Sequence, residues 1–195
     1  MTTSRKVKAV DTGARARLIE STTKVMREEG YAAATSRRIA AEAGVKQALV
    51  YYYFPTMDDL FVEVLRVGGE AALQRMREAL TDDDPLAALW RINCDSSASV
   101  LSTEFMALAN HRKMIRHELK VFAERVRDIE AAAVAVAFRG AGIDVTEFPP
   151  VVVSMLIAQI ARSLGNEEAV GVTAGHAQMR AFVEGRLAGL KVAGR

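Results

Sequence analysis

The sequence predicts an all-α fold of about nine helices. Apolar residues recur every three or four positions through most of the 195 residues, which is the period of an α-helix. Glycine, proline and capping residues interrupt this pattern at short intervals, as helix ends do. No stretch alternates convincingly between apolar and polar residues, so no strand is expected.

The first three predicted helices are short and closely spaced. The first is expected over residues 14–29, where apolar residues share one face, and Gly30 ends it. Helices over about 36–43 and 46–53 follow. Gly44 separates them, because only glycine takes a left-handed conformation without a steric cost.

Six further helices follow, most of them longer. The fourth opens at Thr56, whose hydroxyl is a good N-cap, with two aspartates in the favourable first turn, and it runs to about Leu80. Asp84 and Pro85 then suit the start of a fifth helix. The last five helices are expected over about 85–95, 99–110, 112–139, 150–165 and 173–190.

Charge divides the chain unevenly. Residues 1–57 carry ten Lys or Arg and five Asp or Glu, a balance of +5, whereas residues 58–195 carry sixteen and nineteen, a balance of −3. A basic N-terminal region beside a mildly acidic remainder indicates a nucleic-acid-binding head on a body with another task. Residues 1–13 are expected to form a basic flexible tail, either solvated or adding contacts to DNA.

Enzymatic and metal-binding functions find no motif in this sequence. There is no glycine-rich phosphate loop and no Gly-x-Ser-x-Gly elbow, so we expect no enzyme and no cofactor. His111, His117 and His176 lack a ligand-like spacing, so no metal is expected. Cys94 is the single cysteine, which fits a reducing cytoplasm. No apolar run approaches the ~20 residues that a membrane span needs, and the N-terminus has no secretory signal.

The stretch from Thr35 to Phe54 predicts two short helices joined by a tight turn. This arrangement matches a helix-turn-helix, whose second helix enters the DNA major groove. An ordinary helical hairpin within a core is the alternative. Long polar side chains and three adjacent tyrosines at exposed positions favour DNA binding, since a phenol can donate to a phosphate.

Residues 17–65 resemble the DNA-binding domain of TetR-family transcriptional regulators. The resemblance rests on Glu29-Gly30-Tyr31, Thr35-Ser36, Ile39-Ala40, Ala43-Gly44-Val45, Tyr51, Tyr53-Phe54-Pro55 and Leu60. The sequence departs from the family pattern at Lys46, Ala48 and Met57, where Ser, Gly and Lys are common. These departures change the face that reads bases and remove one phosphate contact, so no operator sequence can be borrowed from the family.

The resemblance implies sequence-specific binding to double-stranded, palindromic operator DNA. Lys46 and Gln47 would begin the recognition helix, where side chains approach base edges. Arg38 is expected to reach bases from the preceding helix, while the tyrosines mostly hold the backbone. The predicted DNA contacts are Thr35, Ser36, Arg37, Arg38, Lys46, Gln47, Ala48, Tyr51, Tyr52, Tyr53 and Thr56.

A homodimer would double these contacts and match a palindrome. The eighth and ninth predicted helices carry more apolar residues than one buried face needs, and two from each subunit would form a four-helix bundle. Alternatively, both stripes are buried within the monomer. The predicted interface residues are Val152, Val153, Leu156, Ile160, Leu164, Phe182, Val183 and Leu187.

The resemblance also implies an effector pocket walled by the fifth to eighth helices. Its lining would be large, apolar and adaptable, with a few polar groups that orient a small hydrophobic molecule. The candidates are Trp90, Asn93, Cys94, Phe105, Met106, Met114, Phe122, Met155 and Gln159, with Asn110 as a further polar group.

These expectations define a domain plan and a function. A helix-turn-helix domain over 14–57 is followed by a linking helix over 58–80 and a ligand-binding and dimerisation domain over 81–195. We expect a repressor released by a small hydrophobic effector. The alternative is a DNA-binding regulator without a ligand, whose body serves dimerisation or protein partners, and a helical enzyme is a distant third.

Overall fold

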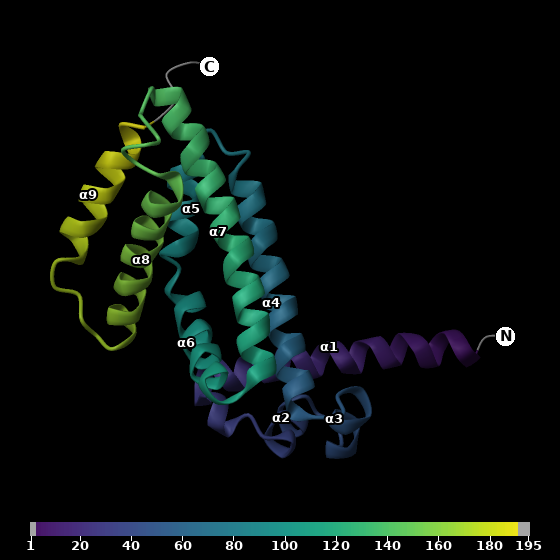
Figure 1. Ribbon diagram of the computed structural model, residues 1–195. Helices are drawn as coiled ribbons and strands as arrows, with labels where there is room; N and C mark the ends of the chain where they lie inside the picture. The colour runs from purple at the N-terminus through teal and green to yellow at the C-terminus, as the bar shows by residue number, and fades with distance from the viewer. Residues whose placement is uncertain (1–2, 191–195) are drawn as a thin grey trace. The chain divides into compact units, whose positions relative to one another are not determined.

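The computed structural model confirms the all-α fold. It describes residues 3–190, with the side chains of residues 13–95 and 100–190. Within these residues the chain forms nine α-helices and one short 3-10 helix, and no strand (Figure 1). No helix in the described part of the chain is long and apolar enough to cross a membrane.

The helices follow the predicted order. Their bounds are α1 (Thr3–Glu29), η1 (Tyr31–Ala33), α2 (Ser36–Glu42), α3 (Gln47–Tyr53), α4 (Met57–Ala79), α5 (Pro85–Asn93), α6 (Ser96–His111), α7 (Lys113–Ala141), α8 (Pro150–Ala169) and α9 (His176–Ala188). Most of the predicted ends lie within three residues of these bounds.

Two helix ends differ from the prediction. The flexible tail expected over residues 1–13 is helical from Thr3 onward, because adding a turn to an existing helix costs no new nucleation. Residues 1 and 2 lie outside the described part. α8 continues past Gly165 to Ala169, where Glu167 and Glu168 form polar contacts with side chains of α9. These contacts with α9 stabilise the last turn of α8, although Gly165 and Asn166 favour an earlier helix end.

The chain divides into two compact units. One holds Met1–Gly69 with Leu101–Lys120, and the other holds Glu70–Val100 with Val121–Arg195. Three helices, α4, α6 and α7, therefore contribute residues to both units. This division does not follow the predicted plan, in which the head ends at residue 57, and that plan remains a prediction about functional regions.

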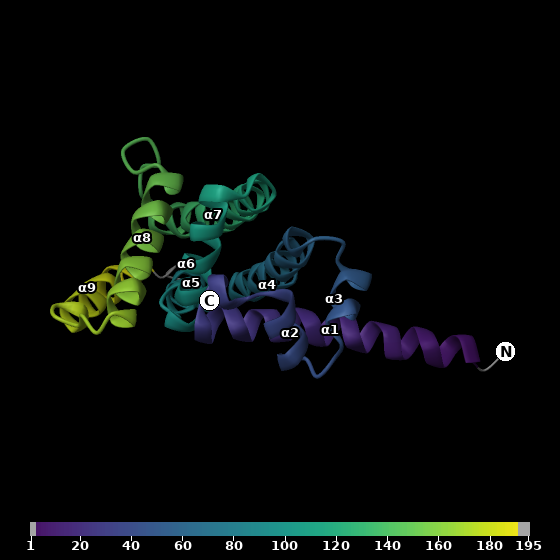
Figure 2. The same cartoon turned by 90° about the horizontal axis from the view of Figure 1, so that it is seen from below.

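The first unit has its own apolar core. α2 packs against both α1 and α3, as two views of the ribbon show (Figures 1 and 2). Leu18, Ile39, Val50 and Leu60 are fully buried there, and each contributes roughly 1.5–3 kcal/mol through loss of its contact with water. Residues distant in sequence, Phe105, Leu108 and Ile115 among them, complete the same core.

The second unit is built around α5 and α7. α5 packs against α8 and α9. Trp90 is 2% exposed and lies in a core cluster with Phe138 of α7, Ala161 and Leu164 of α8, and Val183 of α9. α7 supplies Ala133, Val134, Ala137 and Phe138 to this core, whereas Val136 of the same helix is exposed by 60%.

Local hydrogen bonds fix the helix starts that the sequence predicted. The hydroxyl of Thr56 accepts from the Asp59 amide at 3.2 Å, and the Asp59 carboxylate accepts from the Thr56 amide at 2.9 Å. This reciprocal capping box begins α4. At α5, the Asp84 carboxylate accepts from the Ala87 amide at 3.1 Å, and Pro85 occupies the first turn.

A glycine shapes the end of α1. Gly30 has φ of 82° and ψ of 161°, a region that side chains with a Cβ rarely adopt. The turn that it allows presents the Tyr31 amide to Glu104 of α6, which accepts at 2.6 Å. Backbone geometry at Gly30 thus links the head to a segment 73 residues away in the sequence.

We expect Gly30→Ala to lower the free energy of unfolding by ~1–3 kcal/mol, the cost of an unfavourable backbone conformation. Gly68→Ala is the matched control, because Gly68 is an exposed residue within α4 with open space around its Cβ position. The control should gain ~0.5–1 kcal/mol. Urea unfolding followed by far-UV circular dichroism measures both, and equal stability of G30A and wild type would contradict the assignment.

Candidate functional site

The turn between α2 and α3 has the geometry expected of a helix-turn-helix. Gly44 lies in the left-handed region with φ of 65°. The Val45 amide donates to the Ala40 carbonyl at 2.9 Å and the Gly44 amide donates to the Ala41 carbonyl at 3.2 Å. This pair of bonds is a Schellman motif, which ends α2 and directs the chain into α3.

Burial determines which side of α3 is available. Val50 is fully buried and Phe54 is 3% exposed, both within the core of the first unit. Gln47, Ala48, Tyr51 and Tyr52 are exposed, and their spacing of one and four places them on the other side of the helix. α3 therefore offers one polar and aromatic face to a partner.

The Ser36 hydroxyl organises that face. Ser36 is 8% exposed, and its Oγ accepts from Gln47 Nε2 at 2.8 Å and from the Tyr51 hydroxyl at 3.1 Å. Both bonds run from α3 to the first turn of α2. They fix two predicted base- and backbone-contacting side chains in one orientation.

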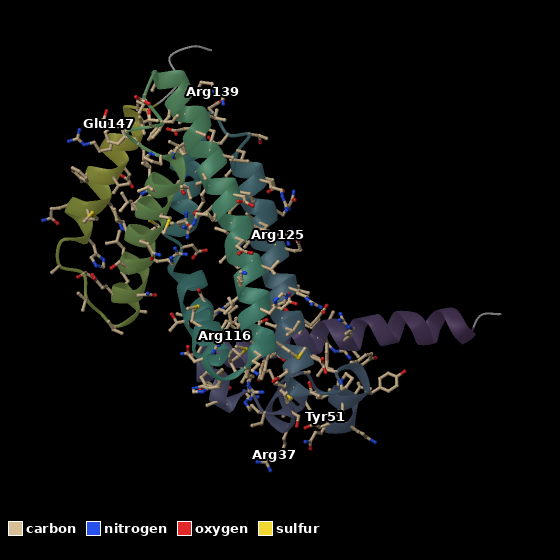
Figure 3. All side chains as sticks on the ribbon, in the orientation of Figure 1. Arg37, Tyr51, Arg116, Arg125, Arg139 and Glu147 are labelled. Carbon is tan, nitrogen blue, oxygen red and sulfur yellow. The ribbon has the colours of Figure 1, made fainter. Side chains whose placement is uncertain are left out.

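Other predicted contact residues surround this group. Arg37, Lys46 and Tyr52 are exposed, and Arg37 projects away from the ribbon (Figure 3). Tyr53 is half-buried and packs against the core, and its ring meets that of Tyr52 edge-on at 5.0 Å. Rigid rings held in this way lose little entropy when they bind a partner.

Thr35 and Thr56 are exposed helix caps. The Thr35 hydroxyl accepts from the Arg38 amide at 3.2 Å and caps α2. Thr56 caps α4, as described above. Each hydroxyl therefore orients a helix N-terminus, where free amides and the helix dipole favour a phosphate.

Arg38, which is predicted to reach bases, forms ion pairs within the protein. Its guanidinium donates to Glu29 at 2.6 Å and pairs with Glu42 at 2.9 Å, and Lys24 pairs with Glu42 at 2.6 Å. The bonds to Glu29 and Glu42 raise the pKa of Arg38, while those from Lys24 and Arg38 lower the pKa of Glu42. This exposed network joins α1 to α2, and its carboxylates balance the positive charge of Arg38.

The predicted effector residues are divided between the two units. Phe105 is buried in the core of the first unit, while Met106 and Met114 are exposed there. In the second unit Trp90 is buried, and its indole nitrogen donates to Glu184 at 3.3 Å. The remaining candidates are Asn93, Cys94 and Phe122, which are half-buried, and Met155 and Gln159, which are exposed on α8.

A buried carboxyl lies beside one of these candidates. Asn93 donates to Glu130 of α7 at 2.9 Å, and Glu130 is only 5% exposed. Burial raises the pKa of Glu130, and the bond from Asn93 opposes this to a lesser extent. The prediction missed Glu130, although its spacing of four from Val126 and three from Ala133 follows the apolar stripe of α7. Burial also raises the pKa of the Cys94 thiol, which disfavours a reactive thiolate.

The predicted interface residues separate into two sets. Leu164, Val183 and Leu187 are buried within the second unit, and Val153 and Ile160 are half-buried against the same core. Val152, Leu156 and Phe182 are exposed by 48%, 59% and 60%. Met155 and Met179 are also exposed on these two helices, so α8 and α9 keep apolar surface after the monomer core is complete.

Metal binding has no support in the part of the chain that the structure describes. No group of three or more His, Cys, Asp or Glu side chains lies together there. His176 instead pairs with Glu167 at 2.8 Å, between α9 and the last turn of α8. This contact joins two helices and accounts for the burial of the ring.

Part of the chain is similar to known regulatory proteins. Residues 18–64 match the sequence model of the family described as bacterial regulatory proteins, tetR family. The chain is 27% identical over 119 residues to the HTH-type transcriptional regulator BetI of Rhizobium meliloti (strain 1021), covering 56% of this chain and 59% of BetI. The match thus spans less than two thirds of that relative.

Solved structures share the fold across most of the chain. A transcriptional regulator from Saccharomonospora viridis in complex with choline has a TM-score of 0.76 at 18% identity, with 89% of this chain and 96% of that chain covered. FadR from Bacillus subtilis in complex with stearoyl-CoA has a TM-score of 0.69 at 16% identity, with 92% and 98% covered. At these identities the likeness establishes the fold.

Glu130 predicts a pH-dependent difference in stability. Its pKa is raised in the folded state, so the wild type loses stability as pH rises from the unfolded pKa of about 4.3 through the folded value. The amide in Glu130→Gln does not titrate but can still accept from Asn93. We therefore expect E130Q to gain stability relative to wild type as pH rises through this window, measured by urea unfolding.

The matched control, Glu147→Gln, removes a carboxylate at an exposed position (Figure 3). A difference between E130Q and wild type that stays constant from about pH 4 to pH 7 would show that burial does not perturb Glu130.

Proposed function

We propose that this chain is a TetR-family member, that it is a sequence-specific DNA-binding transcriptional regulator, and that it acts as a repressor in the cytoplasm. The observation that carries the proposal is the coincidence of two features. The family match covers residues 18–64, and the same segment forms a helix-turn-helix whose α3 exposes Gln47, Ala48, Tyr51 and Tyr52. A buried hairpin would have no such face.

In this proposal α3 lies in the major groove of operator DNA. Lys46 donates to guanine acceptors and Gln47 to an adenine edge, while Ala48 makes an apolar contact. The phosphates are held by Arg37, by the hydroxyls of Tyr52 and Tyr53, and by the helix N-termini capped by Thr35 and Thr56. Tyr51, whose hydroxyl donates to Ser36, fixes the face that presents these groups. Ser36 and Arg38 act as positioning residues, because their polar groups are engaged within the protein.

The proposed assembly is a homodimer on a palindromic site. The exposed residues Val152, Leu156 and Phe182 support it, because an apolar surface that the monomer leaves uncovered is suited to a second copy. The buried residues Leu164, Val183 and Leu187 do not contact the second copy in this proposal. They pack in the core of the second unit and hold α8 and α9 in place. Two helices from each subunit would form the interface.

The proposed effector is a small hydrophobic molecule bound in the body. Trp90, Asn93, Cys94 and Phe122 of the second unit are the candidate lining residues that are buried or half-buried. Neighbours of the same fold have been solved with choline and with stearoyl-CoA, which supports ligand binding by this architecture. The exposure of Met155 and Gln159 on α8 favours a second candidate function, in which the body serves only dimerisation or a protein partner.

Selection from a random DNA library tests base reading. We expect the wild type to enrich one sequence, and Gln47→Ala to relax the preference at a single base position by ~1–3 kcal/mol, because one side chain reads one base pair. Tyr51→Phe is the comparison variant, since it removes the hydroxyl that donates to Ser36 but no base contact, and it should weaken all sequences alike. If Q47A kept the base preference and affinity of the wild type, the assignment of Gln47 as a base-reading residue would be wrong.

Sedimentation tests the dimer. The wild type should sediment at twice the 21.2 kDa chain mass, and the pair Leu156→Glu and Phe182→Glu should give a folded monomer, because buried unpaired carboxylates oppose association. Val136→Glu is the matched control, since Val136 is exposed by 60% like Leu156 and Phe182 but lies on α7. A wild type that stays monomeric on DNA would rule the dimer out.

A further inference from the structure

A pocket in the second unit contains none of the residues that the sequence predicted for DNA binding, effector binding or dimerisation. Its volume is about 180 Å³. The walls come from the connection between α4 and α5, from the face of α7 that carries Ala133, Val136 and Ala137, and from Leu190. Ala133 and Ala137 have small side chains, so this face of α7 leaves a space that larger residues would fill.

The polar lining of this pocket is acidic. Of its ten lining residues eight are apolar, and the two polar ones are Asp83 and Asp84. The Asp84 carboxylate accepts from the Ala87 amide and is engaged as a helix cap. Among the described residues Asp83 is exposed and has no hydrogen-bond or ion-pair partner, so its charge is available to a ligand.

The balance of charge at the rim is negative. Asp83 and Asp84 supply two carboxylates to the lining. Asp82, the preceding residue in the sequence, pairs with Arg91 at 3.4 Å. The N-terminus of α5 adds only about half a positive charge. Among the described residues no basic side chain lines the pocket, so an anion would be repelled by these carboxylates and a cation would meet the unpaired carboxylate of Asp83.

The volume limits the ligand to a small molecule. A protein cavity of ~150 Å³ can hold benzene, whereas drug-sized ligands occupy roughly 300 Å³ or more. A compact apolar group of a few carbon atoms therefore fits this space. Placed against alanine, valine and leucine, it would gain by leaving water.

We propose that this pocket binds a small organic cation, with a compact alkylammonium group against α7 and its charge beside Asp83. The site goes beyond the proposed function, because none of the residues proposed to line the hydrophobic effector's site lines this pocket. Any effect on DNA binding rests on that function. The binding itself rests only on the pocket, and it is tested without DNA.

Calorimetric titration of the full chain with choline tests the proposal. The comparison ligand is 3,3-dimethylbutan-1-ol, which has the same shape without the charge. With so few atoms, choline should bind saturably in the millimolar range. The neutral isostere should bind about fivefold more weakly, which is near the upper end for an exposed ion pair.

Two variants with matched controls locate the site. Asp83→Asn should weaken choline by about fivefold, whereas Asp128→Asn, at an exposed aspartate of α7, should not. Val136→Phe should fill the mouth and reduce binding by tenfold or more. Val121→Phe places the same ring at another exposed valine of α7 and should leave binding unchanged.

Three results would overturn the proposal: no saturable choline binding, equal binding of choline and its neutral isostere, or wild-type affinity in V136F. Circular dichroism confirms that each variant is folded. A chain that binds choline in this way but selects no DNA sequence would contradict the proposed function and leave the cation site in place.

Discussion

One buried hydroxyl determines how the recognition surface is presented. The Ser36 Oγ accepts from both Gln47 and Tyr51, and it lies at the first turn of α2, so the two helices are joined at the point where α3 must be oriented. Each such bond contributes only ~0.5–1.5 kcal/mol to stability. Its larger consequence is conformational, because a glutamine that is already fixed loses less rotamer freedom on binding. Arg37 and Lys46 are exposed around this ordered centre, and they would attract DNA through their positive charge.

The head depends on more of the chain than the helix-turn-helix itself. Phe105, Leu108 and Ile115, from the end of α6 and the start of α7, complete the core that holds Ile39 and Val50. The bond from the Tyr31 amide to Glu104 adds a polar link to the same segment. A fragment that ends at residue 57 would lose these partners and expose apolar surface. The folded unit therefore extends beyond Thr56, the last of the proposed DNA contacts.

The sequence predicted the features that local chemistry decides. Gly44, Thr56 and Asp84 mark helix ends through caps and turns made within a few residues, and all three act as expected. It did not predict features that need a distant partner. Arg38 pairs with Glu29 of α1, which only the packing of α1 on α2 brings to it, although its pair with Glu42 has the local i,i+4 spacing of a helix. Glu130 is buried because Asn93 of α5 faces it. The pocket beside Asp83 exists because α7 places alanines there, which no periodicity reveals.

The central claim is that two copies of α3 read DNA from ordered faces, and a hydroxyl-radical footprint of the bound chain tests it most directly. A two-fold dimer places its recognition helices in successive major grooves on one side of the duplex. The account predicts two protected patches, related by symmetry, with centres about one helical turn or ~10 base pairs apart, or a multiple of that spacing. A single asymmetric patch, or uniform weak protection along the fragment, would contradict it.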